Sequence, residues 1–264
     1  MEQVSRPGIL ERLFIACFRP SRYKELLSVS KLGHVLYFIC IVFLLLFIDT
    51  IIPFAAWDVH VGGLRTLFTE RIPAFTVEKG KMTIEKPLEF DINGIIHFKA
   101  DSSAERYKKE DLDKEYAEEF LFSSTNLLIK MEDRTLDVSM GDLTKDKLDN
   151  QNLVEAIPVF RLFIFIYFFS SYMVKALTYM ITVLFFAALC RAAIRTKDGK
   201  FVSLKGTIVI TIYAKTLFSL IHSVNTCSGT PIGETLILIL GTFGTMMYIN
   251  RAEAAILGIS PKKE

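Results

Sequence analysis

Four long apolar runs restrict what this chain can fold into. They cover residues 36–57, 159–190, 206–224 and 232–250. A helix needs about 20 apolar residues to cross the roughly 30 Å hydrocarbon core of a bilayer. The second run would be ~48 Å long as one straight helix at about 1.5 Å per residue. We therefore expect a break at Ser170 and Ser171, with residues 171–190 crossing and residues 159–169 lying at the outer surface or extending above it.

The composition supports a membrane protein. Hydrophobic residues make up 51% of the 264 residues and include 22 Phe, which is more than a water-soluble core of this size needs. The first run is too long for the core of a signal peptide, and no small-residue cleavage site follows it cleanly. We expect an uncleaved anchor at residues 34–57.

Basic residues cluster beside the runs and predict the topology. The clusters are Arg19, Arg22, Lys24 and Lys31 before the first run, Arg191, Arg195, Lys197, Lys200 and Lys205 after the second, and Arg251, Lys262 and Lys263 at the end. Positively charged short loops stay in the cytoplasm. All three clusters fall on one side only if there are four spans. The predicted location is the cell membrane, multi-pass, with a cytoplasmic amino-terminal segment 1–33 and a cytoplasmic carboxyl-terminal tail 251–264.

The acidic segment between the first two spans has the pattern of β-strands. Residues 57–157 contain 14 Lys and Arg against 21 Asp and Glu. FTVE-KG-KMTIE and LEFDI-NG-IIHFKA alternate around two-residue turns typical of hairpins. EFLFSS, NLLIKM and TLDVSM are further predicted strands, and the charged residues 102–119 form a solvated helix or a loop.

The predicted fold class is therefore membrane α-helical: a four-span bundle with an extracytoplasmic β-rich (α+β) domain, residues 58–157, inserted between spans one and two. Residues 158–250 hold an interfacial segment and spans two to four. Residues 9–33 mix apolar and basic side chains, which is typical of an interfacial helix with a juxtamembrane linker. Simple determination of topology explains the same pattern equally well.

Charged residues inside the spans are the candidate functional residues, because each costs a few kcal/mol at the bilayer centre. They are Asp49, Lys175, Lys215 and Glu234. Two polar stripes at helical spacing contain the lysines and, facing each other, could line a hydrophilic path or an anion-binding cavity. The stripes are Thr207, Thr211, Lys215, Ser219 and His222, and Ser171, Lys175, Thr178 and Thr182. Interhelical hydrogen bonding explains the same residues. Asp49 and Glu234 are expected near the depth of Lys175, so either could pair with it.

Motifs for catalysis are lacking in the sequence. No zinc-protease, nucleophile-elbow, phosphate-loop or dinucleotide pattern occurs, and the four His and four Cys are scattered singly. We expect no enzyme activity, no catalytic residue, no cofactor, no metal, no disulfide framework and no nucleic-acid partner.

Three segments together resemble a bacterial membrane family known as domain of unknown function 1189. They are FRPSRYKELLSVSKLGHVLYF, IPAFTVEKGKMTIEKP and the three-span block after residue 157. Members of that family include proteins labelled maltodextrin-utilisation proteins. The resemblance implies a Gram-positive-type cell membrane and an association with sugar-uptake operons, and it supplies no catalytic residues.

These observations favour a polytopic accessory or sensory protein. Its outer domain would bind a ligand, an envelope component or a transporter subunit, and the bundle would sit in the lipid bilayer, either alone or as a homo-oligomer. The alternative is a small transporter or channel-like subunit that uses the stripes around Lys175 and Lys215. Four spans could form a pore only by oligomerising, and the sequence has no pair of broken helices of the kind that transporter sites use.

Overall fold

The computed structural model describes residues 7–92, 96–131, 134–144, 146–193 and 202–258. The chain divides into two compact units. The first, here the helical unit, is Met1–Ala55 with Phe165–Glu264, and the second, here the β-rich unit, is Ala56–Ile164. The divisions fall inside two helices, α4 and α8, and each unit is described by itself.

The helical unit contains the long helices of the chain. In chain order the elements that contribute to it are α1 (Ile9–Phe18), η1 (Pro20–Arg22), α2 (Tyr23–Leu26), α3 (Lys31–Leu46), η2 (Phe47–Ile51), α4 (Ile52–Val61), α8 (Ile157–Ala193), α9 (Leu204–Cys227) and α10 (Glu234–Leu257). Three stretches are long and apolar enough to cross a membrane: Lys31–Val61, Ile157–Arg191 and Leu204–Cys227. They indicate a membrane protein. α10 is as long as α9 but is not among the three.

Helix α8 corrects one prediction. It runs without interruption for 37 residues, so the break expected at Ser170 and Ser171 is wrong. Serine has only a moderate helix penalty, unlike proline, and a pair of serines does not remove a backbone hydrogen bond. At about 1.5 Å per residue the helix is ~56 Å long. Tilt or projection beyond the hydrocarbon, rather than a break, therefore has to accommodate its length.

The first candidate span widens into a π-helical turn at η2, between α3 and α4. The amide of Ile52 donates to the carbonyl of Phe47, five residues back, instead of four. Pro53 follows at once, and its ring has no N–H and collides with the carbonyl four residues earlier. A wider turn just before a proline relieves that collision, and such turns often occur at functional sites. Asp49 lies inside this turn.

The core of the helical unit is rich in tyrosine. Tyr23, Tyr37 and Tyr213 are almost fully buried, and helices α1 and α3 pack against α9 around them. The Tyr37 hydroxyl lies 2.9 Å from Thr216 Oγ1. Tyr23 donates to the carbonyl of Ala16 at 2.7 Å. Each buried ring thus packs with its hydroxyl satisfied, which is the condition under which tyrosine is stable in a core.

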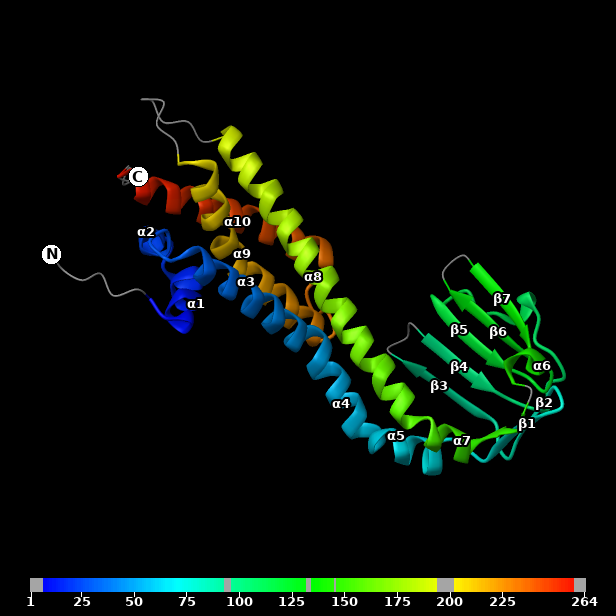
Figure 1. Ribbon diagram of the computed structural model, residues 1–264. Helices are drawn as coiled ribbons and strands as arrows, with labels where there is room; N and C mark the ends of the chain where they lie inside the picture. The colour runs from blue at the N-terminus through cyan, green and yellow to red at the C-terminus, as the bar shows by residue number, and fades with distance from the viewer. Residues whose placement is uncertain (1–6, 93–95, 132–133, 145, 194–201, 259–264) are drawn as a thin grey trace. The chain divides into compact units, whose positions relative to one another are not determined.

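The β-rich unit consists of two sheets (Figure 1). A three-stranded sheet has the order β2 (Lys81–Ile84), β1 (Phe75–Glu78), β8 (Leu148–Asp149). A five-stranded sheet has the order β3 (Leu88–Ile92), β4 (Ile96–Ala100), β5 (Glu118–Phe122), β6 (Asn126–Met131), β7 (Arg134–Ser139). Short helical elements complete the unit: α5 (Gly63–Thr66), η3 (Leu67–Arg71), η4 (Lys109–Asp111), α6 (Met140–Leu143) and α7 (Asn150–Glu155).

The predicted strands are confirmed. Strands β1 and β2 pair around Lys79 and Gly80, which both have positive φ, as a primed hairpin turn requires. Strands β3 and β4 also pair antiparallel, and their predicted Asn93-Gly94 turn lies outside the described residues. Strand β8 and the parallel pairing of β4 with β5 were not predicted. The charged residues 102–119 form mostly loop, with the short η4 inside it.

The five-stranded sheet has one apolar face and a second face, here the polar face, where polar side chains lie beside the buried Leu121 and Leu128, because successive side chains of a strand point to opposite sides. The apolar face packs with the three-stranded sheet around Val77, Met82, Ala100, Leu127 and Met140. The polar face is covered by residues 101–117, the crossover that joins β4 to the parallel strand β5. Such crossovers are usually helices. Here the crossover is a loop. Backbone bonds hold residues 101–105 of it, and side chains hold the rest.

Candidate functional site

Two of the predicted intramembrane residues meet in the helical unit. Lys175 Nζ of α8 lies 2.8 Å from Asp49 Oδ2 of η2. The Asp49 side chain is 8% exposed and the Lys175 side chain is 33% exposed. The predicted pairing of Lys175 with one of two acidic residues is therefore found with Asp49. The π-helical turn gives Asp49 its orientation toward α8.

Two hydroxyl groups complete the environment of Asp49. Ser223 Oγ of α9 donates to Asp49 Oδ2 at 3.0 Å, and Thr50 Oγ1 donates to Oδ1 at 2.8 Å. The carboxylate thus links three helices. Glu234, by contrast, is exposed at the first position of α10 and forms no ion pair with any described residue. A negative charge there interacts favourably with the helix dipole, which accounts for it without a partner.

Lys215 contacts an aromatic ring rather than an acid. Its Nζ lies 4.9 Å from the centroid of the Tyr179 ring on α8, a cation–π geometry. The threonines of its stripe bond within the protein: Thr211 donates to the carbonyl of Thr207, and Thr207 donates to Glu253 Oε1 at 2.8 Å. In the described residues, no hydrogen bond joins the two predicted stripes directly. Asp49 connects Lys175 to α9 instead.

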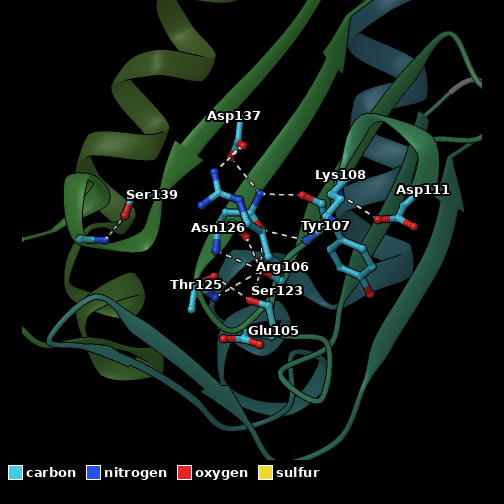
Figure 2. A network of polar contacts seen from close by, with 11 residues as sticks. Glu105, Arg106, Tyr107, Lys108, Asp111, Ser123, Thr125, Asn126, Asp137 and Ser139 are labelled. Carbon is cyan, nitrogen blue, oxygen red and sulfur yellow. Dashed lines mark hydrogen bonds and ion pairs between the residues drawn. The ribbon is translucent and has the colours of Figure 1, made fainter.

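A second polar cluster, in the β-rich unit, was missed by the sequence (Figure 2). Its centre is Asn126, whose side chain is fully buried and uses all its hydrogen-bonding capacity. Asn126 Oδ1 accepts from the Tyr107 amide at 3.0 Å and from Ser123 Oγ at 2.6 Å. Its Nδ2 donates to the Tyr107 carbonyl at 2.9 Å and to Asp137 Oδ1 at 2.8 Å. One side chain of β6 therefore binds the backbone of loop 101–117.

Asp137 on β7 connects this cluster to Arg106 of the loop. Arg106 Nη2 donates to Asp137 Oδ2 at 2.6 Å. The hydrogen bonds from Asn126 and then from Arg106 lower the pKa of Asp137. Glu105 contributes through its carbonyl, which accepts from the Thr125 hydroxyl at 2.6 Å. These contacts place acceptor and donor groups of the sheet against the loop, and they add to the backbone bonds between residues 101–105 and residues 122–125.

A histidine between two carboxylates lies near the other end of the same sheet face. His97 Nδ1 is 2.8 Å from Glu119 Oε1, and His97 Nε2 is 3.2 Å from Glu89 Oε1. The side chains of His97 and Glu119 are 10% and 2% exposed. The ring stacks on Tyr116 of the loop at 4.7 Å between centroids. Glu119 Oε2 also accepts from the amide of Asp113, so the carboxylate ties His97 to the loop.

This geometry favours the charged imidazole. A neutral ring has one N–H donor, while here both ring nitrogens face carboxylate oxygens. Burial acts to lower the pKa of His97, but the hydrogen bonds with Glu119 and Glu89 outweigh it and raise the pKa. Lys99 bonds Glu89 and, as the main cause, lowers the pKa of that carboxyl. His97 can therefore gain or lose a proton. It bonds Glu119, which in turn accepts from the Asp113 amide of the loop.

The sequence contains part of the signal for the Asn126 and His97 clusters. His97, Glu119, Asn126 and Asp137 all lie at polar positions of alternating strands, a pattern that normally means a solvated face. What was missing was the crossover that covers the face. The parallel β4–β5 pairing creates it, and no local pattern indicates a parallel pairing.

Among the described residues, no group of three or more His, Cys, Asp and Glu side chains is arranged to hold a metal ion. All four cysteines are free, and Cys17 and Cys190 are buried. What the arrangement can do chemically is hold charge in the helical unit and exchange a proton at His97.

Comparison with known proteins identifies a family. The profile of a family described as "Protein of unknown function (DUF1189)" matches residues 10–250. No curated protein and no solved structure matches the chain.

Proposed function

This chain belongs to the DUF1189 family, and from that premise we propose that it is a polytopic accessory or sensory membrane protein without catalytic activity. In this proposal the β-rich unit lies outside the cytoplasm and binds an envelope component or a transporter subunit. The helical unit anchors it in the bilayer.

The observation that carries the proposal is the architecture of the β-rich unit. A connection between two membrane helices needs only a few residues. Here the connection has a core of its own, in which Val77 and Met82 of one sheet pack with Leu127 of the other. It also has a buried polar network centred on Asn126. A folded module of this kind, on long apolar helices, supports a binding role.

A four-span arrangement supports the placement of this unit. With α10 as a fourth span, the basic segments before α3, between α8 and α9, and after α10 share the cytoplasmic side. α10 packs along α9, where Gly244 lies against the ring of Phe218. Small residues at such a contact are typical of membrane helix packing.

Cysteine labelling tests the topology. Cys40 and Cys227 would be replaced by serine, the buried Cys17 and Cys190 would be kept, and one further cysteine would be introduced at exposed Lys108 or Lys205. A membrane-impermeant thiol reagent applied to intact cells should label the first position and not the second. Labelling of both from outside, or of Lys205→Cys alone, would contradict the arrangement.

Partner capture tests the binding role. The full chain would be purified in mild detergent from crosslinked cells, beside a control in which residues 74–149 are replaced by a short flexible linker. A transporter subunit or an envelope polymer should be recovered with the full chain and not with the control. Equal recovery with both, or no recovery with either, would argue against the proposal.

A further inference from the structure

Helix α1 of the helical unit has one face that packs and one that does not. Ile15 and Ala16 are fully buried, and α1 packs against α9. Arg12 fixes its orientation: the guanidinium donates from Nε to the Pro7 carbonyl at 2.8 Å and from Nη1 to the Gly33 carbonyl at 2.9 Å. The helix is therefore a fixed part of the helical unit and not a trailing segment.

The opposite face carries an exposed apolar strip. Leu10, Phe14 and Phe18 follow at intervals of four residues and so share one face of the helix. Their exposed fractions are 78%, 47% and 66%. Phe14 and Phe18 also contact each other, with ring centroids 5.4 Å apart. The ten-residue helix thus buries one face in the protein. Its other face is apolar as well, and two aromatic rings remain exposed there.

Basic side chains without acidic partners lie at the end of α1 and on the two helices that follow it. Arg19, Lys24 and Lys31 are exposed and form no ion pair within the described part of the chain. The Arg19 guanidinium lies 5.3 Å from the centroid of the Phe14 ring. Arg22 differs, because Glu25 and Glu11 both bind it. Three unpaired cations close together in the sequence, one of them beside an aromatic ring of the strip, are complementary to an anionic surface that has an apolar layer beneath it.

The depth of α1 is set by its contact with the first candidate span. Arg12 binds the carbonyl of Gly33, and that span begins at Lys31. α1 is thus level with the first turn of a helix that enters the hydrocarbon. The first two turns of α3 also carry exposed apolar side chains, Leu32, Val35 and Leu36.

We propose that α1 lies in the plane of the membrane surface. Leu10, Phe14 and Phe18 insert into the hydrocarbon just beneath the headgroups. Arg19, Lys24 and Lys31 bind the phosphate groups of anionic phospholipids. Interfacial helices bury their apolar face about 5–10 Å into the boundary between headgroups and acyl chains. This inference does not depend on what the β-rich unit binds.

Fluorescence quenching in reconstituted full-length protein tests the depth. Trp57 is the chain's one tryptophan, so Trp57→Phe gives a silent background for single probes. Phe14→Trp is the test probe and replaces one exposed aromatic ring by another. Phe43→Trp on α3, twelve residues into the span and 53% exposed, serves as the deep reference, and exposed Lys109→Trp in the β-rich unit as the aqueous one.

Lipids brominated high on the acyl chain should quench Phe14→Trp more than lipids brominated near the chain end. Phe43→Trp should show the reverse order, and Lys109→Trp should respond only to aqueous iodide. The proposal is overturned if Phe14→Trp behaves like either reference. It is also overturned if no quencher reaches the probe, because protein then covers the strip.

The charges are tested by lipid selectivity. Quenching of Phe14→Trp by an anionic lipid with a spin-labelled headgroup should exceed quenching by its zwitterionic analogue. Arg19→Gln with Lys24→Gln should reduce that preference on the order of fivefold per charge removed. Lys108→Gln with Lys109→Gln removes the same charge from the β-rich unit and should leave it unchanged. No preference in the parent protein, or an equal loss in the control, would overturn the headgroup assignment.

Discussion

The contact between Lys175 and Asp49 predicts an unequal response to removing either partner. Lys175→Met takes away an ammonium 2.8 Å from a carboxylate that is only 8% exposed. Breaking a buried pair in this way costs roughly 3–5 kcal/mol. The bonds from Ser223 and Thr50 remain, and the lysine side was partly solvated at the start. We therefore expect a loss of about 2–3 kcal/mol in the free energy of unfolding.

Asp49→Asn should cost less. The amide oxygen can still accept from Ser223 or Thr50, and the long side chain of Lys175, already one-third exposed, can turn toward water or headgroups. About 1 kcal/mol is expected for the lost charge-assisted bond. The double variant leaves neither charge stranded, so it should lose less than the two singles together, with a coupling of about 1–2 kcal/mol.

Reversible unfolding of the full chain in mixed detergent micelles measures these differences. Glu234→Gln is the matched control, because Glu234 is an exposed acid with no ion pair to a described residue. Combined with Lys175→Met, it should simply add. A coupling below about 0.5 kcal/mol between Lys175 and Asp49, within the usual error of additivity, would refute the reasoning. So would a larger loss for Asp49→Asn than for Lys175→Met.

Three further predictions concern the rest of the molecule. The pKa of His97 in the folded protein is raised from 6.5. Protection of loop 101–117 from hydrogen exchange should therefore be fullest below pH 6.5 and fall as the pH rises through the raised pKa. His97→Gln should remove this pH dependence of protection, and a dependence that persists in the variant would contradict the prediction. Asn126→Ala should lower the exchange stability of β6 by about 2–4 kcal/mol through four lost hydrogen bonds, while Lys109→Ala should not. Gly244→Ala should lower the melting temperature, because its Cβ would lie 2.0 Å from Phe218 Cζ, whereas Gly241→Ala, at 3.7 Å from Phe218 Cβ, should leave it unchanged.

The sequence predicts the elements well where the signal is local. Apolar length indicates the membrane helices, and alternation with two-residue turns indicates the hairpin of β1 and β2. The break at Ser170 and Ser171 was wrong because it came from a length limit on the hydrocarbon and not from any helix-breaking residue in α8. A helix longer than the bilayer is thick does not have to break.

The candidate sites, too, were predictable only as far as local signals reach. Similar depth in the membrane was enough to bring Asp49 and Lys175 together as a hypothesis, yet it could not distinguish Asp49 from Glu234. That choice depends on the rotation of each helix, and the π-helical turn before Pro53 sets it for Asp49. Nor could any local pattern connect His97 with Glu119, 22 residues away, because a parallel pairing joins their strands.

The Asn126 and His97 clusters of the β-rich unit both hold loop 101–117. A sensory response would therefore arise in this loop. A sensor requires two states whose populations a ligand or a proton can shift. The sheets hold together by ladder bonds. Beyond three backbone bonds at residues 101–105, loop 101–117 is held by side chains: Asn126 at one part, and Lys130 with the His97–Glu119 pair at another. Loss of one cluster frees part of the loop without breaking a strand. The pH and Asn126→Ala predictions therefore test the same element from two sides. If His97→Gln and Asn126→Ala expose separate parts of the loop to exchange, the loop opens in pieces, and if each exposes all of it, the loop moves as one unit.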